Sequence, residues 1–66
     1  MSDKTAGQIF SKAREDKHLT QAEVAEKAGI HPNTYAKIER DKQKASFLTI
    51  KKLAMVLDLD IKDIPA

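Results

Sequence analysis

Three residues, Gly29-Ile30-His31, separate two short segments that each carry strong helix signals. Thr20 and Glu23 form a capping box at the start of the first segment, because each side chain can bond a free backbone N–H of the other residue. Gly29 can adopt the left-handed conformation that ends a helix, and Pro32 suits the first turn of the next helix. The sequence therefore predicts two helices joined by a very short turn, at residues 21–28 and 32 to about 40.

The remaining apolar residues also recur at helical spacing, and no stretch alternates as a half-buried strand does. We expect a first helix over about Thr5 to Lys17, a fourth helix capped by Ser46, and a short last helix between Asp60 and Pro65. The apolar stripe of the fourth helix is Phe47, Ile50, Leu53, Ala54 and Leu57. The pattern predicts a compact, all-α, five-helix fold in a single domain of residues 1–66, with its core at about residues 5–64.

Size and composition exclude several classes of protein. A chain of 66 residues buries about 60% of its unfolded surface, which leaves no layer for a deep substrate cavity. The absence of cysteine excludes disulfides, thiolate metal sites and cysteine nucleophiles. No nucleophile–base pair, carboxylate dyad or phosphate-binding glycine loop stands at a usable spacing. We therefore expect no enzyme and no cofactor, and we expect no metal site because His18 and His31 are far apart in sequence.

Hydrophobicity along the chain gives no sign of a membrane segment. The longest uninterrupted apolar run, Leu53 to Leu57, is far shorter than the roughly 20 residues that span a bilayer. Residues 1–10 lack the apolar block of a signal peptide. We expect a soluble cytoplasmic protein with no membrane partner and no small-molecule ligand.

The net charge of +2 is unevenly distributed. Residues 31–52 carry six cations against two anions, whereas residues 53–66 carry three anions against one cation. A positive middle third suggests a face for a polyanion, with an acidic end turned away from it. A merely solvated surface explains the same charges equally well.

The block from Leu19 to Ile30 strongly resembles the second helix and turn of the Cro and phage-repressor type of helix-turn-helix regulators, the xenobiotic-response-element-like family of bacteria and phages. Tyr35 to Glu39, and Leu53-Ala54 with Leu57, match the same family further on. The resemblance implies a lambda-repressor-like DNA-binding domain with its helix-turn-helix at about residues 20–40. It also implies a bacterial or phage-encoded protein that associates with the nucleoid when bound to DNA.

The resemblance also sets expectations for particular positions. Asp41 and Asp58 stand where the family usually has glycine after the third and fourth helices, and Ala45 stands where it often has proline. Aspartate tolerates the left-handed conformation better than most residues, at some cost. The family pairs Arg14 with Glu39 in a largely buried ion pair, and we expect both residues to be structural here.

In this family the third helix enters the major groove of duplex DNA while the second helix crosses the backbone. Asn33 can pair with adenine, and Lys37, one turn further along, can donate to guanine. We expect Thr34, Pro32 and His31 to join them in reading bases, although a purely capping role explains His31 equally well. The expected phosphate contacts, which include a tyrosine hydroxyl at the helix edge, are Gln21, Tyr35, Arg40, Lys42, Gln43 and Lys44.

Three apolar residues near the C-terminus, Leu59, Ile61 and Ile64, either close the core or form the two-fold dimer contact common in this family. We expect a homodimer, because two domains of this size place equivalent helices about one DNA turn, roughly 34 Å, apart on a palindromic operator. The leading function is a sequence-specific, double-stranded-DNA-binding transcriptional regulator, a repressor by occlusion, on an inverted-repeat operator. The alternative is a protein-interaction module, such as a small antitoxin or a coactivator-like bridging domain.

Overall fold

A computed structural model describes residues 4–65 of the chain, and over this range the fold is all-helical. Its elements in order are α1 (Ala6–Asp16), α2 (Gln21–Ala28), α3 (Pro32–Glu39), α4 (Phe47–Leu57) and a single 3-10 turn, η1 (Ile61–Asp63). None of these helices has the length and apolar character that a bilayer crossing requires. Over the part of the chain that the structure covers, the predicted all-α class is confirmed.

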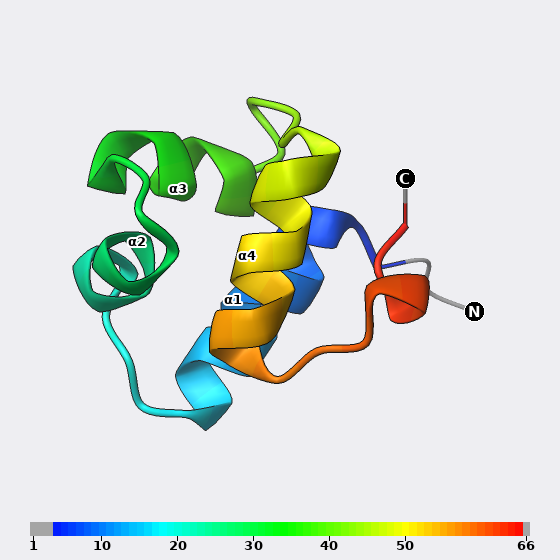
Figure 1. The fold of residues 1–66 in the computed structure, drawn as a ribbon, viewed down its shortest axis with the longest axis horizontal. Coiled ribbons are helices and arrows are strands. Elements are labelled where there is room, and N and C mark those ends of the chain that lie inside the picture. The colour runs from blue at the N-terminus through cyan, green and yellow to red at the C-terminus, as the bar shows by residue number, and fades with distance from the viewer. Residues whose placement is uncertain (1–3, 66) are drawn as a thin grey trace.

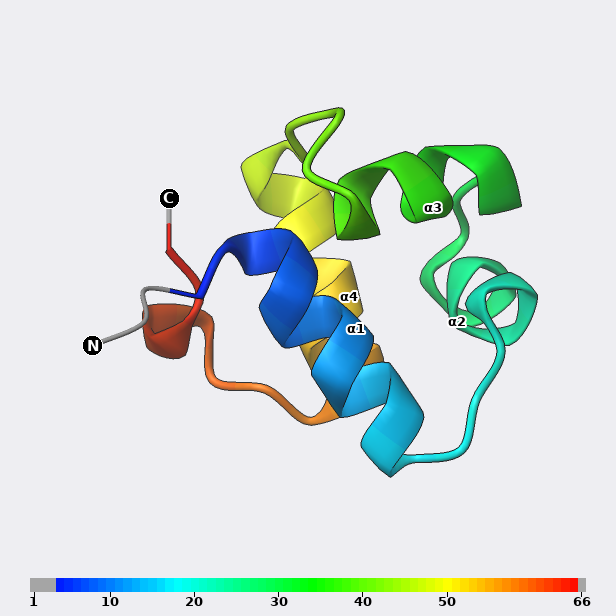
Figure 2. The same cartoon turned by 180° about the vertical axis from the view of Figure 1, so that it is seen from behind.

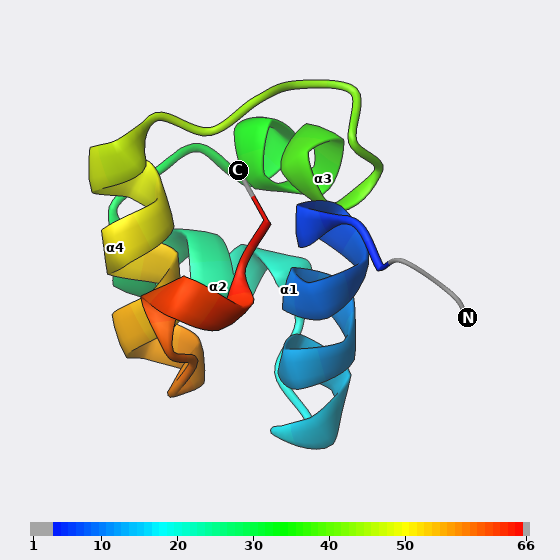
Figure 3. The same ribbon diagram turned by 90° about the vertical axis from the view of Figure 1, so that its right-hand side faces the viewer.

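The helices surround one small core. α1 and α4 stand side by side, as Figure 3 shows, and α3 lies across one end of them. α2 packs against α3 and α4 on one side, while η1 lies against α4 on the opposite side (Figures 1 and 2). The core between them consists of Phe10, Val24, Ala25, Ala28, Tyr35, Ile38, Leu53, Ala54, Leu57 and Ile64.

Capping residues set where the helices begin. Thr5 and Thr20 each form a complete capping box, and in both the hydroxyl accepts a backbone N–H three residues on. Ser46 caps α4 through its hydroxyl, which accepts the Thr49 N–H at 3.2 Å. The predicted boundaries of the first three helices and the predicted start of the fourth agree with the structure to within one residue, because these local signals and the tertiary packing act at the same places.

The prediction of a fifth α-helix is wrong. Asp60 does cap the segment, since its carboxylate accepts the Lys62 N–H at 3.1 Å, but only the three-residue turn η1 follows. Ile64 is extended, with φ −101° and ψ 117°, because the residue before a proline is disfavoured in the helical region. The C-terminal segment therefore closes the core with one isoleucine rather than with a helix face.

Phe47 does not belong to the apolar stripe of α4 as expected, since its side chain is 67% exposed. It occupies the first position of the helix, where a side chain leans back over the preceding turn instead of onto the core. Its ring lies 5.6 Å from Lys51 Nζ, within the range of a cation–π interaction. The other residues of the predicted stripe do face the core: Ile50 is half-buried, and Leu53, Ala54 and Leu57 are buried.

Two aspartates occupy the left-handed turns that the sequence predicted. The φ angle is 58° at Asp41 and 56° at Asp58, and each follows the last turn of a helix. At the end of α4, the Leu59 N–H reaches back to the Ala54 carbonyl at 2.8 Å, which is the bond that such a turn makes possible. Lys17 Nζ lies 2.6 Å from the Asp58 carboxylate and so links the ends of α1 and α4.

We expect Asp58→Gly to be neutral or mildly stabilising. Glycine removes a left-handed strain of roughly 1 kcal/mol, and the lost ion pair with Lys17 offsets no more than that because the Asp58 side chain is 77% exposed. Thermal unfolding followed by circular dichroism measures the balance. A clear fall in melting temperature would show that the ion pair contributes more than the strain costs.

Candidate nucleic-acid interface

α2 and α3 form a two-helix unit with a tight turn. Gly29 ends α2 in the left-handed conformation, with φ 73° and ψ 31°, and the Ile30 N–H then bonds the Ala25 carbonyl at 2.9 Å. Ala25 is completely buried, so its small side chain lets the two helix backbones approach each other. Figure 1 shows α2 nearly end-on beneath α3, so the two helices cross at a steep angle and α3 lies along the edge of the molecule.

The outer face of α3 carries the residues expected to read bases. Asn33 and Lys37 are both exposed, and their four-residue spacing puts them on the same face of the helix. Thr34 is half-buried between them, while Pro32 and His31 are exposed at the N-terminal tip. Across residues 4–65, Lys37 forms no salt bridge, so its ammonium is available to an external acceptor.

His31 has a capping role. Its Nδ1 accepts the Asn33 N–H at 3.0 Å, and its backbone is extended as a cap requires, with φ −70° and ψ 139°. Because Nδ1 is an acceptor, the ring proton lies on Nε2, which remains a donor at the tip of α3. The capping and base-reading explanations are therefore compatible.

The loop that follows α3 continues the polar surface. Arg40, Lys42, Gln43 and Lys44 are all exposed there. Figure 1 places this loop and the start of α4 on the same side of the molecule as α3. The three cations of the loop have no carboxylate within ion-pair distance among the described residues. This side of the domain thus carries unneutralised positive charge, the property that a phosphate backbone requires. The start of α4 adds two exposed apolar side chains, Phe47 and Leu48.

Behind this surface, a buried ion pair joins α1 to the end of α3. Arg14 Nε donates to Glu39 Oε2 at 2.7 Å and Nη2 donates to Oε1 at 3.2 Å, so the contact is bidentate. The side chains are only 16% and 5% exposed. Arg14 Nη1 also donates to the Leu19 carbonyl at 3.0 Å, which ties the chain before α2 to the same guanidinium. The structure thus contains the ion pair that the family resemblance implied.

Two residues expected at phosphates take part in this buried cluster. Gln21 Nε2 donates to Glu39 Oε1 at 2.8 Å, and its side chain is half-buried. Tyr35 is completely buried and its hydroxyl has no hydrogen-bond partner in the structure, so the expectation that it reaches the helix edge is wrong. Burial raises the pKa of the Tyr35 hydroxyl, which stays neutral. Its position facing the core follows from α3 periodicity, since Tyr35 and Ile38 are one turn apart.

Glu39 remains ionised despite its burial. Burial raises the pKa of its carboxyl group, but the hydrogen bonds from Arg14 and Gln21 outweigh this effect and hold the pKa below its usual value of 4.5. A carboxylate whose pKa is lowered by folding stabilises the folded state above its unfolded pKa. That contribution is present at neutral pH and is lost as the pH falls below about 4.5.

The three residues expected at a dimer contact lie in different environments. Ile64 is only 9% exposed and belongs to the core, Leu59 is half-buried against it, and Ile61 is 37% exposed. Met55, on the outer side of α4, is 79% exposed and was not expected at the surface contact. Its position opposite the buried Leu53 and Leu57 is visible in the helical spacing, which could have revealed it.

Comparisons with known proteins agree with this geometry. The helix-turn-helix family pattern matches residues 10–64. The immunity repressor protein of Bacillus phage phi105 is 35% identical over 60 residues, which cover 91% of this chain. The chain spans only 42% of the length of that curated relative.

Two solved structures share the fold over nearly the whole domain. The restriction-modification controller protein C.AhdI from Aeromonas hydrophila is 29% identical, with a TM-score of 0.83 over 88% of each chain. The master regulator for biofilm formation SinR, known from Bacillus subtilis and solved in complex with DNA, is 32% identical, with a TM-score of 0.82. That alignment covers 88% of this chain and 94% of the SinR chain.

We expect Arg14→Met to destabilise the domain by about 3–5 kcal/mol, because it leaves the buried Glu39 carboxylate without its partner. The double variant Arg14→Met/Glu39→Leu removes both charges and should recover most of the loss. Urea unfolding at pH 7 measures both free energies. If the double variant were no more stable than Arg14→Met, the loss would come from the bond of the guanidinium to the Leu19 carbonyl, which both variants lack, and not from the stranded charge.

Proposed function

The chain belongs to the helix-turn-helix family, as a regulator of the phage-repressor type, and from this premise we propose that it is a sequence-specific transcriptional repressor that binds double-stranded DNA. The observation that carries the proposal is the outer surface of α3, where Asn33 and Lys37 lie exposed on one face and a loop of unpaired cations follows. Repression follows from occlusion of a promoter by the bound domain. The structure of SinR in complex with DNA supports the same use of this fold.

In this proposal α3 lies in the major groove and its outward side chains meet base edges. Asn33 pairs with adenine through N6 and N7, and Lys37 donates to guanine O6 or N7 one helical turn away. Thr34 offers a methyl group to thymine, and His31 and Pro32 contact the groove at the helix tip. Each of these contacts distinguishes one base pair from the others, because the four base pairs differ in the major groove.

The phosphate contacts come from the segments that flank α3. Arg40, Lys42, Gln43 and Lys44 bind the backbone beyond the helix, and release of counterions from that backbone provides most of the sequence-independent affinity. Gln21 contributes at the start of α2 through the second N–H of its amide, because Glu39 accepts the first. The buried network therefore orients a phosphate donor as well as joining the helices.

We further propose that the repressor acts as a homodimer on an inverted repeat. The domain measures 32 × 23 × 19 Å, so two copies side by side can place their α3 helices near the roughly 34 Å of one DNA turn. The apolar side chains available at the C-terminal end of the domain are Met55, Leu59 and Ile61. The C-terminal end of α4 lies away from α3 in Figure 1, and Asp58 is the residue that follows it.

Two lysine variants test the assigned contacts. We expect Lys37→Ala to weaken binding to a selected duplex by about 1–3 kcal/mol and to relax the preference at one base pair. We expect Lys44→Ala to weaken binding to all duplexes alike and to reduce the slope of log affinity against log salt by about one. Fluorescence anisotropy with a panel of singly substituted duplexes at several salt concentrations measures both effects.

Lys12→Ala serves as the control, because Lys12 is an exposed lysine that is paired with Asp16 on α1. The affinity of the Lys12→Ala variant for DNA should stay close to that of the wild type. If the wild-type protein shows no preference among random duplexes at moderate salt, the repressor proposal fails. A protein-interaction module then becomes the better explanation of the fold.

For the dimer we expect Ile61→Asp to produce monomers, because a two-fold interface places the new buried charge twice. Lys62→Ser lies in the same turn, changes the net charge by the same amount and should leave association unchanged. Sedimentation velocity without DNA compares the two variants with the wild type. An unchanged sedimentation coefficient for Ile61→Asp would place the contact between copies elsewhere.

A further inference from the structure

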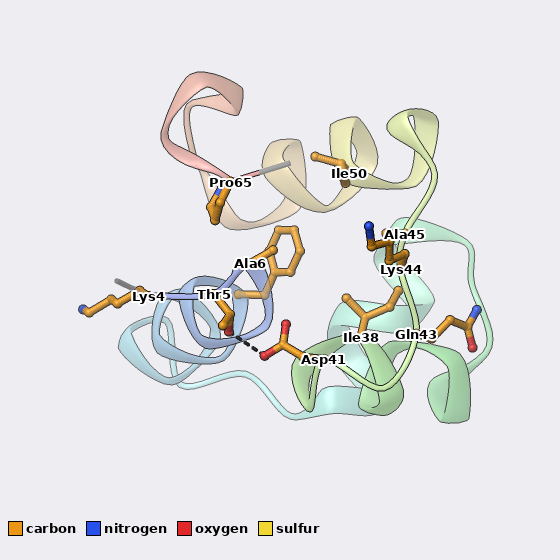
Figure 4. A pocket seen from close by; sticks show the side chains of 11 residues that line it. Lys4, Thr5, Ala6, Ile38, Asp41, Gln43, Lys44, Ala45, Ile50 and Pro65 are labelled. Carbon is orange, nitrogen blue, oxygen red and sulfur yellow. Dashed lines mark hydrogen bonds between the residues drawn. The ribbon is translucent and has the colours of Figure 1, made fainter. Parts of the chain in front are cut away.

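The carboxylate of Asp41 bridges the end of α3 to the start of α1. Its Oδ1 accepts the Gly7 N–H at 3.1 Å, and its Oδ2 accepts the Thr5 hydroxyl, the bond drawn in Figure 4. The approach is close because position 7 has no side chain. A Cβ there would lie 2.4 Å from the Glu39 carbonyl oxygen and 2.5 Å from the Ile38 carbonyl oxygen.

The backbone turn does not require this bridge. Glycine adopts a φ of 58° without strain, so the left-handed turn does not require a carboxylate. At the start of α1, Thr5 accepts the Gln8 N–H, and the Asp41 carboxylate accepts a second free donor of the first turn, the Gly7 N–H. The carboxylate therefore adds a connection between two segments that lie 34 positions apart in sequence.

The bridge lies where the cationic loop leaves α3. Backbone bonds anchor its first residues, from the Asp41 N–H to the Ile38 carbonyl at 3.1 Å and from the Lys42 N–H to the Lys37 carbonyl at 2.9 Å. Beyond that point, Gln43, Lys44 and Ala45 make no hydrogen bond to any described residue before Ser46 caps α4.

Within this stretch only Ala45 packs against the hydrophobic core, while Gln43 and Lys44 are exposed. A cavity of about 420 Å³ lies beside Gln43, Lys44 and Ala45, and its other walls include Phe10 and Ile50 (Figure 4). Asp41 and Thr5 also line this cavity, and Figure 4 draws the bond between them. The Asp41 bridge therefore fixes the start of the loop, the packing of Ala45 fixes its end, and Gln43 and Lys44 lie between these two points.

We propose that Asp41 is a positioning residue for DNA backbone binding, which holds the loop carrying Lys42 and Lys44 at the height of the phosphates. The proposal rests on the DNA-binding function proposed above. It predicts an effect of a definite sign. Asp41 is an anion among cations, so if it acted only through its charge, its removal would strengthen binding to DNA. If it positions the loop, its removal weakens binding.

Asp41→Gly keeps the left-handed turn and removes both acceptors. Asp58→Gly is its matched control, because Asp58 has nearly the same φ, 56°, and the same place after a helix, and loses the same charge. We expect Asp41→Gly to bind a selected duplex about fivefold more weakly than Asp58→Gly, with a salt slope smaller by about one. Asp41→Asn, which keeps an acceptor for the Gly7 N–H, should fall between them.

A second measurement needs no DNA. In ¹⁵N relaxation of the free protein, backbone order parameters of residues 42–45 should fall toward about 0.6 in Asp41→Gly and stay unchanged in Asp58→Gly. Should Asp41→Gly fail to fold, Asp41→Asn carries both comparisons.

Binding by Asp41→Gly that is equal to or tighter than that of Asp58→Gly overturns the proposal, whatever the order parameters show. If the wild type does not bind DNA, the proposed function fails and the role of Asp41 in binding fails with it. The order parameters then still decide whether Asp41 holds the loop, so the two failures are distinguishable.

Discussion

The structure depends on the contact between α1 and the C-terminal end of α3. Gly7 brings the two backbones together, and Arg14 holds Glu39 through two hydrogen bonds in a largely buried site. The same guanidinium reaches the chain before α2, and the same carboxylate accepts the side chain that begins α2. Because one ion pair joins three helices, it fixes the orientation of α3 from its inner side. The outer face of α3 is not needed for this contact.

This division explains the composition of α3. Its inner residues, Tyr35 and Ile38, are completely or nearly completely buried, while Asn33 and Lys37 on the outer face are exposed. A surface residue without a structural partner can change without loss of stability, usually within about 0.5 kcal/mol. The proposed DNA-binding face of α3 can therefore vary in sequence on a constant scaffold.

Local chemistry was enough to predict most of the fold. The capping box of Thr20 and Glu23 and the left-handed Gly29 act within a few residues, so their effects can be read without a structure. Such local signals do not show which residues of a helix reach the core. Helical spacing placed Phe47 in the core, but this first residue of α4 is exposed, and the buried residues of the helix come later. The Asp41 bridge was likewise invisible, because its partners lie at the other end of the domain.

The pair of aspartates in left-handed turns shows why a residue type alone does not define a role. Asp41 and Asp58 each stand where the family usually has a glycine, and their φ angles agree within 2°. Asp58 meets a lysine in an exposed site, where an ion pair is weak, whereas both oxygens of Asp41 bond the first turn of another helix. A domain of this size has a stability of only about 3–10 kcal/mol, so an unneeded left-handed strain at two positions is a sizeable cost. At Asp41 two hydrogen bonds to the start of α1 offset the strain, whereas at Asp58 only an exposed ion pair with Lys17 does so.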